Sequence, residues 1–214
     1  MKYTHIIWDF NGTILNDVQT GIDAVNALLV KYGKKTIGSA DEYREVFCFP
    51  VIDYYEKIGL EREKFPMYAP EWVREYNARE SEAHIFDGVS ELMNFFSKEN
   101  LPQYLLSATE KGMLTSQVKR LGIEGVFEEI IGQKTIEAHG KIGAALEFIG
   151  RVKPQKALFI GDSLHDYEVA CAIGCDCVLL ACGHQDRARL MATGCAVFDD
   201  AFDLLRAFES GEIK

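Results

Sequence analysis

Two apolar segments of this chain each end in a turn that carries aspartate. Residues 6–8 lead into Asp-Phe-Asn-Gly-Thr at 9–13, and residues 157–160 lead into Gly-Asp-Ser-Leu-His-Asp at 161–166. Strands that are apolar along their whole length are typical of a parallel sheet covered on both faces. Because functional groups gather where parallel strands end, we expect the two turns to face each other at one edge of a sheet.

From residue 86 onward, the chain alternates between strand and helix patterns. Strands are predicted at residues 103–107, 129–131, 157–160, 177–181 and 196–198. Helices are predicted at residues 89–97, 111–121, 141–149, 166–173 and 187–192. Gly122 and Gly150 are expected to end two of these helices. The alternation predicts an α/β fold with a parallel sheet between helices.

Residues 15–84 carry helical patterns and no convincing strand. A helix capped by Asn16 or Asp17 is expected to run to Gly33, with apolar side chains recurring on one face. We therefore predict two domains, which are a core of residues 1–14 and 85–214 and an all-helical insert of residues 15–84.

Composition limits the kinds of partner. The 214 residues carry a net charge of -10, which argues against nucleic acid, because its phosphates need a basic surface. A small phosphorylated molecule needs only a local positive site. No signal peptide is visible and no apolar stretch reaches membrane-spanning length, so we expect a soluble, cytoplasmic protein that is a monomer or a homodimer.

The cysteines do not predict a metal site. Six are present, and four of them are crowded together as Cys171, Cys175, Cys177 and Cys182. None of the Cys-x-x-Cys pairs typical of zinc sites occurs among them. Small buried thiols that are kept reduced are the better explanation.

Four residues with useful chemistry fall where a parallel sheet binds ligands. Asp9, Ser107 and Asp162 lie at strand ends, and Lys141 opens a helix. Asp9 is placed to attack phosphorus as a nucleophile. Asp162 and Asp166, four residues apart, supply the hard oxygen ligands that Mg²⁺ prefers.

Ser107 adds a place for the phosphoryl group. Its hydroxyl and the amides that follow, beginning with Ala108, precede a helix expected to start near Glu110. Taken singly, these residues have simpler explanations, since a serine at a strand end is often a cap and a lone lysine is usually solvated. The aspartates of residues 162–166 could also cap a helix, a role that is compatible with metal binding.

Together these motifs resemble the haloacid dehalogenase (HAD) superfamily over essentially the whole chain. Residues 9–13 are similar to its first motif, Asp-x-Asp-Gly-Thr, with Asn11 in place of the second aspartate. Residues 161–166 match its fourth motif, Gly-Asp-x-x-x-Asp. The insert corresponds in position to a helical C1 cap.

The third motif of the superfamily is a single Lys or Arg upstream of the fourth. Lys141, at a helix start after Gly140, is favoured for this place over Lys153 and Lys156. The general pattern, including Gly-His-Gln at residues 183–185, looks like phosphoglycolate phosphatase-like members.

The resemblance implies a Rossmann-like core, a Mg²⁺ requirement and a small phosphate-ester substrate that forms an aspartyl-phosphate at Asp9. The implied catalytic residues are Asp9, Asn11 and Lys141. The implied phosphate-binding residues are Asn11, Gly12, Ser107, Ala108 and Lys141. The implied metal ligands are Asp9, Asn11 through its backbone carbonyl, Asp162 and Asp166.

Asn11 leaves the reaction open. An amide cannot give a proton to a leaving alkoxide or take one from water, and such groups contribute roughly 10²–10⁴-fold in rate. One interpretation is a phosphatase that tolerates Asn11, through a good leaving group or another proton carrier. A second is a phosphonate hydrolase that cleaves a C–P bond. A third is a weakened protein that binds a phosphorylated metabolite without turnover.

The insert supplies candidates for each interpretation. Possible proton carriers are Arg44, Glu45, Asp53 and Tyr54. A phosphonate hydrolase would need a Schiff-base lysine among Lys31, Lys34, Lys35, Lys57 and Lys64, for which surface lysines are the simpler explanation. Residues 46–50 are expected either in a substrate-contacting loop or at the interface with the core. Hinges are expected near residues 14–17 and 84–88.

Overall fold

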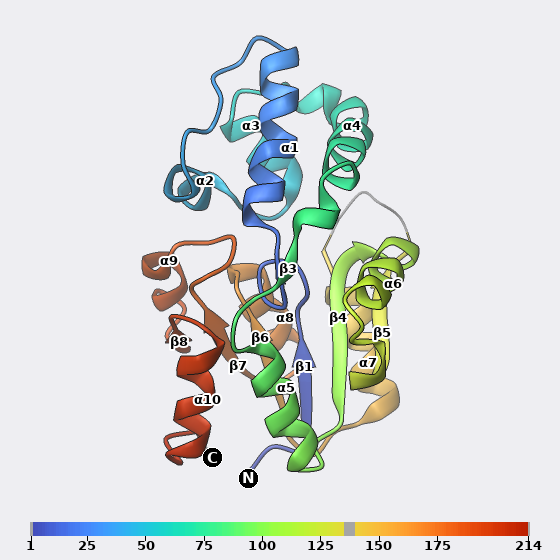
Figure 1. The fold of residues 1–214 in the computed structure, drawn as a ribbon, viewed down its shortest axis with the longest axis vertical. Helices are drawn as coiled ribbons and strands as arrows, with labels where there is room; N and C mark the ends of the chain where they lie inside the picture. The colour runs from blue at the N-terminus through green and yellow to red at the C-terminus, as the bar shows by residue number, and fades with distance from the viewer. Residues whose placement is uncertain (1, 135–139, 214) are drawn as a thin grey trace.

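The computed structural model describes residues 2–134 and 140–213, which form an α/β core with a group of helices above it (Figure 1). The strands of the core are β1 His5–Trp8, β4 Gln103–Glu110, β5 Phe127–Gln133, β6 Ala157–Gly161, β7 Asp176–Leu180 and β8 Ala196–Phe198. They form one sheet in the order β5-β4-β1-β6-β7-β8, and every neighbouring pair is parallel. The predicted fold class is confirmed.

The strand order places the two aspartate-bearing turns side by side. β1 lies between β4 and β6, with Ile7 opposite Tyr104 on one side and opposite Phe159 on the other. Asp9 directly follows β1, and Asp162 directly follows β6. Both aspartates therefore lie at the carboxyl end of the sheet.

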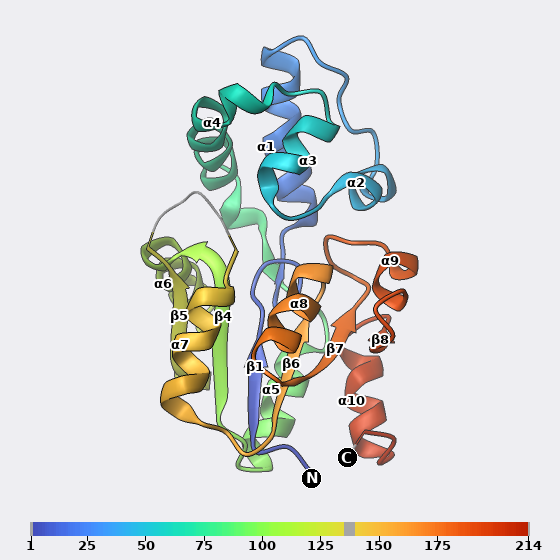
Figure 2. The ribbon, with the colours of Figure 1, turned by 180° about the vertical axis from the view of Figure 1, so that it is seen from behind.

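Helices cover both faces of the sheet (Figures 1 and 2). They are α5 Val89–Lys98, α6 Lys111–Arg120, α7 Ile142–Val152, α8 Leu164–Ala172, α9 Arg187–Met191 and α10 Ala201–Glu209, with a 3₁₀ helix at Glu124–Val126. Side chains from α5, α6 and α10 share a buried cluster with Ile6 and Trp8, whereas those from α7 and α8 share another with Ile7. Because β1 faces apolar layers on both sides, the three residues that follow His5 in this strand are all apolar and buried.

Helix α10 lies in a segment for which the sequence pattern predicts no element. Its N-cap residue, Asp200, accepts a hydrogen bond from the Asp203 amide. Phe208 packs edge-on against Phe96 of α5, with 5.1 Å between the ring centroids. The helix is stabilised because its apolar face packs against α5, which is distant in sequence.

Helix α7 does not end at Gly150, as the sequence pattern predicts. It continues to Val152, and Lys153 then adopts a left-handed conformation with φ of 50°. A glycine inside a helix costs only about 1 kcal/mol relative to alanine, which packing of the helix readily offsets.

The helices above the core form the predicted all-helical insert, and we refer to residues 15–84 as the cap. They are α1 Val18–Lys31, α2 Ala40–Val46, α3 Val51–Lys57 and α4 Phe65–Asn77, with 3₁₀ helices at Arg62–Lys64 and Glu80–Glu82. They bury a cluster of their own, which includes Val25, Leu29 and Tyr68.

Two short strands lie where the cap joins the core. β2 Leu15–Asn16 pairs with β3 His84–Ile85 in an antiparallel ladder, although the sequence pattern predicts no strand there. The ladder coincides with the expected hinges, and the domain limits at residues 14 and 85 remain our prediction. Within residues 2–134 and 140–213, no helix is both long enough and apolar enough to cross a membrane.

Candidate active site

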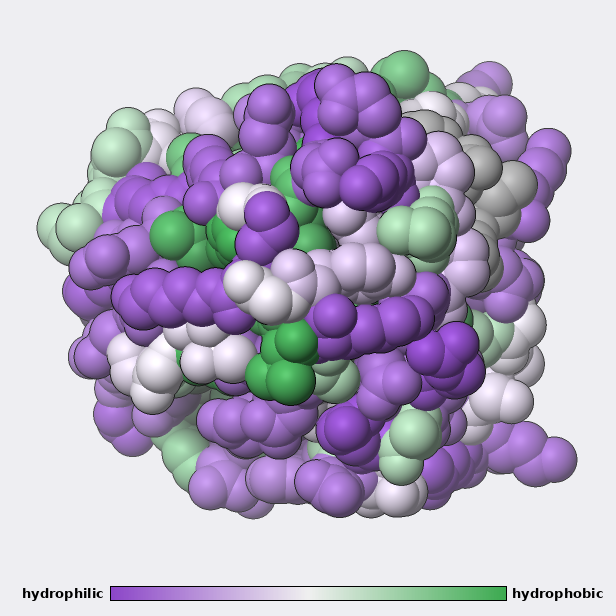
Figure 3. Space-filling model, turned by 90° about the horizontal axis from the view of Figure 1, so that it is seen from above, coloured by the Kyte–Doolittle hydropathy of each residue, from purple (hydrophilic) through white to green (hydrophobic). Residues whose placement is uncertain are grey.

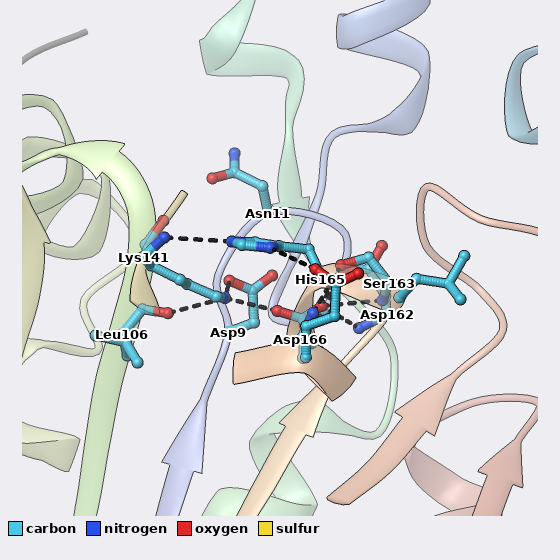
Figure 4. Close-up of polar contacts among 12 residues, drawn as sticks. Asp9, Asn11, Leu106, Lys141, Asp162, Ser163, His165 and Asp166 are labelled. Atoms are coloured by element: carbon cyan, nitrogen blue, oxygen red, sulfur yellow. Dashed lines mark hydrogen bonds and ion pairs between the residues drawn. The ribbon is translucent and has the colours of Figure 1, made fainter. Parts of the chain in front are cut away.

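The residues predicted to share a site meet at the carboxyl end of the sheet (Figure 4). The amide of Asp9 donates to the Ile160 carbonyl at 2.9 Å, which ties the turn after β1 to β6. Asp162 begins the turn between β6 and α8, and Lys141 occupies the N-cap position of α7. The side chains of Asp9, Lys141 and Asp162 are all buried.

Lys141 is the buried cation of the site. Its ammonium forms ion pairs with Asp9 and Asp166, the latter at 2.6 Å, and donates to the Leu106 carbonyl at 3.2 Å. Burial acts to lower the pKa of Lys141, but the two carboxylates leave that pKa raised above its ordinary value. Lys141 therefore stays charged and lies beside the expected nucleophile.

Asp166 fixes this lysine and the turn before α8. One carboxylate oxygen pairs with Lys141, and the other accepts hydrogen bonds from the Asp162 amide and from the Ser163 amide and hydroxyl, at 2.6–3.0 Å. Burial acts to raise the pKa of Asp166, but the ion pair with Lys141 and the hydrogen bonds hold it below its ordinary value. Both predicted roles, at a helix start and in the site, are compatible with this geometry.

Asp162 is held by the turn after β1 and the loop after β7. It accepts hydrogen bonds from the Thr13 hydroxyl at 3.1 Å and from the His184 amide at 2.6 Å. Gly12 has a φ of 74°, and a Cβ there would lie 2.3 Å from an Asp162 carboxylate oxygen. Only glycine allows the two turns to approach this closely.

The acidic cluster carries uncompensated negative charge. Oxygens of Asp9, Asp162 and Asp166 lie within 4.8 Å of one another, and they are the only group of this kind among the residues that the structure describes. Burial, followed by repulsion from Asp166, raises the pKa of Asp9 well above its ordinary value, although Lys141 opposes the rise. Burial likewise raises the pKa of Asp162 to about 6.

A divalent cation fits this cluster. Three carboxylates and one ammonium leave two negative charges unbalanced in a buried place, and a lone buried charge is strongly unfavourable. The donors are all hard oxygens, which is the ligand type that Mg²⁺ selects. The predicted magnesium site is therefore consistent with the charge and the chemistry of the residues present.

The Asn11 side chain points away from the carboxylates of Asp9, Asp162 and Asp166 (Figure 4), and it is hydrogen-bonded to two cap residues and one core residue. Its amide nitrogen donates to Asp17 at 2.8 Å and to the Tyr76 hydroxyl at 3.2 Å. Its amide oxygen accepts from the Thr109 hydroxyl at 2.7 Å. The surroundings thus require a side chain that donates on one side and accepts on the other. Asparagine does both, whereas an ionised aspartate can only accept.

Asp17 and His184 form a buried ion pair next to Asn11. The carboxylate lies 3.2 Å from the imidazole Nε2 and also accepts from the Gly12 amide and the Tyr76 hydroxyl. Burial acts to lower the pKa of His184, but Asp17 raises it to about 9. Burial acts to raise the pKa of Asp17, but the imidazolium and the hydrogen bonds hold it low.

Asp17 is the N-cap residue of α1, as predicted, but its side chain does not cap the helix. The carboxylate turns into the site instead, where a histidine distant in sequence pairs with it. The helix itself ends at Lys31, two residues before the predicted Gly33.

β4 is longer than predicted and includes the segment after Ser107 that is expected to bind phosphate. β4 continues past Ser107 to Glu110, and the Ser107 hydroxyl accepts a hydrogen bond from the Thr109 amide at 3.0 Å. Glu110 caps α6 by accepting from the amides of Gly112 and Met113. The first amides of α6 are therefore already bonded, which leaves Ser107 and the segment beside it facing the cavity.

The cap residues proposed as proton carriers are mostly engaged elsewhere. Arg44 donates to the carbonyls of Cys182 and Gly183, Asp53 pairs with Arg62, and Glu45 is exposed. Only Tyr54 of that set lines the cavity between cap and core.

The five cap lysines proposed for a Schiff base also lie outside the cavity. Lys31, Lys35 and Lys64 pair with surface glutamates. Among the described residues that line the cavity, Lys141 is the only lysine.

Residues 46–50 lie both beside the cavity and at the interface between cap and core, and contact with a substrate remains a prediction. Phe47 and Phe49 line the cavity, and Phe49 stacks on His165 with 4.9 Å between the ring centroids. The Phe47 carbonyl accepts from Arg189 of α9 at 2.8 Å, which joins the cap to the core.

Comparison with known proteins agrees with this geometry. A family model described as haloacid dehalogenase-like hydrolase matches residues 6–180. A phosphoglycolate phosphatase of Pseudomonas savastanoi pv. phaseolicola is 24% identical over 190 residues, which cover 84% of this chain and 70% of the relative. A phosphoglycolate phosphatase of Synechococcus elongatus is 23% identical over 189 residues, which cover 87% and 88% of the two chains.

Solved structures share the fold. A haloacid dehalogenase-like family hydrolase from Streptococcus pneumoniae superimposes with a TM-score of 0.84 at 20% identity, covering 96% of this chain and 98% of the other. A predicted phosphatase from Clostridium acetobutylicum gives a TM-score of 0.83 at 13% identity, covering 97% and 99%.

Proposed function

The chain belongs to the haloacid dehalogenase-like hydrolases, and we propose that it is a Mg²⁺-dependent phosphohydrolase that acts on a small phosphorylated molecule through Asp9. One observation carries the proposal most strongly. Asp9 is buried at the floor of the cavity, in contact with the Lys141 ammonium and beside Asp162. A nucleophile, a cation and an oxygen-rich metal site thus face the same space.

In the first step, each of the core residues has a separate role. An Asp9 oxygen attacks phosphorus, the P–O bond to the leaving group breaks, and an aspartyl-phosphate forms. Lys141 neutralises charge on the nucleophile and on the phosphoryl oxygens, and Ser107 offers a hydroxyl to the same group. Asp166 acts through Lys141, which it holds in place.

Asp9, Asp162 and the Asn11 carbonyl would hold the metal. When bound, Mg²⁺ supplies positive charge that stabilises the transferring phosphoryl group. Asp166 is also expected as a metal ligand. We assign it first to Lys141, because one of its oxygens pairs with that ammonium and the other is bonded to three donors of the turn.

The second step returns Asp9 to its starting state. Water attacks the phosphorus of the aspartyl-phosphate, the Asp9 carboxylate leaves, and the proton of the water passes to phosphate or solvent. Asn11 can orient a water or a leaving oxygen by hydrogen bonding, but it cannot take or give the proton. Leaving groups that depart without protonation are therefore favoured.

Phosphoglycolate is a second candidate substrate, because the named relatives are phosphoglycolate phosphatases. Cleavage of a C–P bond is less well supported, since the cap lysines it would need lie away from the cavity. Binding without turnover is also less well supported, because Asp9, Lys141 and Asp162 are arranged as phosphoryl transfer requires.

The test is phosphate release by purified protein from a panel of phosphate monoesters, acyl phosphates and anhydrides. We expect release with Mg²⁺, none after chelation by EDTA, and none from Asp9→Asn. Silence across the panel, with Mg²⁺ present and the protein folded by circular dichroism, would contradict the proposal.

A further inference from the structure

The half of the cavity that the cap forms is apolar. The cavity has about 1200 Å³ of empty space, counting its open mouth. Asp17, which pairs with His184, is the charged cap residue of the lining, and every lining residue between positions 18 and 84 is glycine, alanine, valine or aromatic. On α4, the lining residues Phe65, Ala69, Trp72 and Val73 follow the spacing of a single helical face.

This apolar character belongs to the cavity and not to the whole cap. Figure 3 looks onto the cap from above, and hydrophilic residues dominate that face, with hydrophobic ones in small separate patches. Eight of the ten aromatic residues between positions 18 and 84 line the cavity.

Cations in the cavity lie on the core side and are already paired. Of the described lining residues, Lys141 contacts Asp9 and Asp166, and His184 contacts Asp17. A second anionic group on the substrate would be buried against aromatic rings with no cation to balance it, which is strongly unfavourable. The part of the bound substrate that lies against the cap should therefore carry no charge of its own.

One polar atom on the cap side lacks a partner. Tyr54 is only 3% exposed, and its hydroxyl makes no hydrogen bond to any residue that the structure describes. The hydroxyls of Tyr43 and Tyr76, by contrast, are bonded to His184 and Asp17. Because an unpaired buried hydroxyl is unfavourable, a ligand with an acceptor near Tyr54 would be stabilised there.

We propose that the substrate is an aryl phosphate: a phosphate monoester of a phenol or naphthol whose uncharged ring occupies the aromatic half of the cavity and offers an acceptor to Tyr54. Trp72, Phe49 and the other aromatic rings supply stacking and edge contacts to such a ring. The inference rests on the proposed phosphohydrolase function and names its substrate class.

An aryl phosphate would also explain how the reaction proceeds without a proton donor at position 11. A phenol has a pKa of about 10, whereas an aliphatic alcohol is a far weaker acid whose pKa lies close to that of water. When Asp9 attacks phosphorus and the P–O bond breaks, the aryl oxide takes both electrons of that bond and leaves as an anion. It takes a proton from solvent afterward, so no side chain has to donate one.

The first experiment compares kcat/KM for phenyl phosphate and 1-naphthyl phosphate with that for phosphoglycolate and glycerol 3-phosphate, all with Mg²⁺. We expect the aryl esters to be preferred by at least tenfold. A preference for either charged or aliphatic ester would overturn the aryl assignment and leave the phosphohydrolase function standing.

A pair of variants on α4 tests the apolar half directly. Val73→Arg places a cation in the lining, and Met67→Arg places one on the exposed side of the same helix. Val73→Arg should shift the ratio of kcat/KM for phosphoglycolate over phenyl phosphate upward by at least tenfold, and Met67→Arg should leave it unchanged. Equal ratios in both variants would overturn the assignment.

If no ester is hydrolysed, a binding measurement still tests the aryl assignment separately from the phosphohydrolase proposal. Calorimetric titration of Asp9→Asn with 1-naphthyl phosphate and with phosphoglycolate needs no turnover. Tighter binding of the naphthyl ester by at least tenfold would support the aryl assignment even though the hydrolase proposal had failed. Equal binding, or tighter binding of phosphoglycolate, would overturn it.

Discussion

The core side of the cavity is charged and its polar groups are bonded to one another, whereas the cap side is aromatic and aliphatic. Asp9, Lys141 and Asp162 come from turns that follow or precede elements of one rigid sheet. The cap lining comes from the start of α1, from α2, α3 and α4, and from the segment between α2 and α3. From this difference we infer that the core residues carry out the proposed phosphoryl transfer and that the cap residues select the group attached to the phosphate.

Asn11 lies on the boundary between these halves. It belongs to the catalytic turn, but its side chain is bonded to Asp17 and Tyr76 of the cap and to Thr109 of the core. Asn11 therefore joins the two halves through hydrogen bonds, and in the proposed mechanism it gives no proton to the leaving group.

The largest expected effect is on the core side. Asp9→Asn should lower kcat by roughly 10⁴-fold or more, because it removes the nucleophile. Asp53→Asn, which alters an exposed carboxylate of the cap paired with Arg62, should leave kcat within about twofold. Steady-state phosphate release measures both, and comparable losses in the two variants would break the distinction between core and cap.

Exchanging the amide of Asn11 and the carboxylate of Asp17 should have the next largest effect on turnover. Asn11→Asp alone would put two carboxylates where Asn11 and Asp17 now lie 2.8 Å apart, so one would have to hold a proton. Asn11→Asp combined with Asp17→Asn restores a donor and an acceptor. We expect the double variant to raise kcat/KM for aliphatic phosphates by roughly 10²-fold.

The single variant should gain clearly less than the double variant, and Asp17→Asn alone should gain nothing. If Asn11→Asp alone matched the double variant, the network around Asn11 would not be limiting turnover in the way described.

On the cap side, Trp72→Ala should raise KM for phenyl phosphate by about tenfold through lost stacking and apolar contact. Acetyl phosphate, which has no ring, should show an unchanged KM. A matching rise in KM for acetyl phosphate would mean that the substitution disturbs the core side as well.

The smallest expected effect concerns metal and pH. The pKa of Asp162 is raised in the folded protein to about 6, so its protonated form is favoured and the metal-free protein loses stability as pH rises from about 4 through 6. Bound Mg²⁺ favours the ionised form. Mg²⁺ should therefore raise the Tm by several degrees more at pH 7.5 than at pH 5, as differential scanning calorimetry would show.

Asp162→Asn is the control for that measurement. It removes the titrating carboxylate, so the Tm increase caused by Mg²⁺ should become small at both pH values. An equally large, pH-independent increase in the variant would place the metal elsewhere.

The sheet and the core half of the site were largely predictable from the sequence. An apolar strand that ends in Asp9 and another that ends before Asp162 can be recognised locally, and a parallel sheet then brings their ends together. Lys141 was recognisable from its place after Gly140, and Lys156 turns out to pair with Asp176 on the surface.

The hydrogen bonds around Asn11 and the aromatic lining of the cap were not predictable in the same way. Asp17 looks like an ordinary N-cap, and nothing local indicates that His184, which lies far along the chain, draws its carboxylate away. The aromatic residues of the cap carry the pattern of a helical core, and only the folded arrangement separates those that line the cavity from those, such as Tyr68, that are packed inside.

The most direct test of the account is the dependence of kcat/KM on the pKa of the leaving group. Phosphate esters of substituted phenols and of aliphatic alcohols, compared with Mg²⁺ at one pH, would give this dependence for the wild-type protein and for the Asn11→Asp, Asp17→Asn double variant. We predict a steep fall in log kcat/KM with rising leaving-group pKa in the wild-type protein and a shallower one in the double variant. A flat dependence in the wild-type protein would show that a proton donor still serves the leaving group, and it would contradict the account.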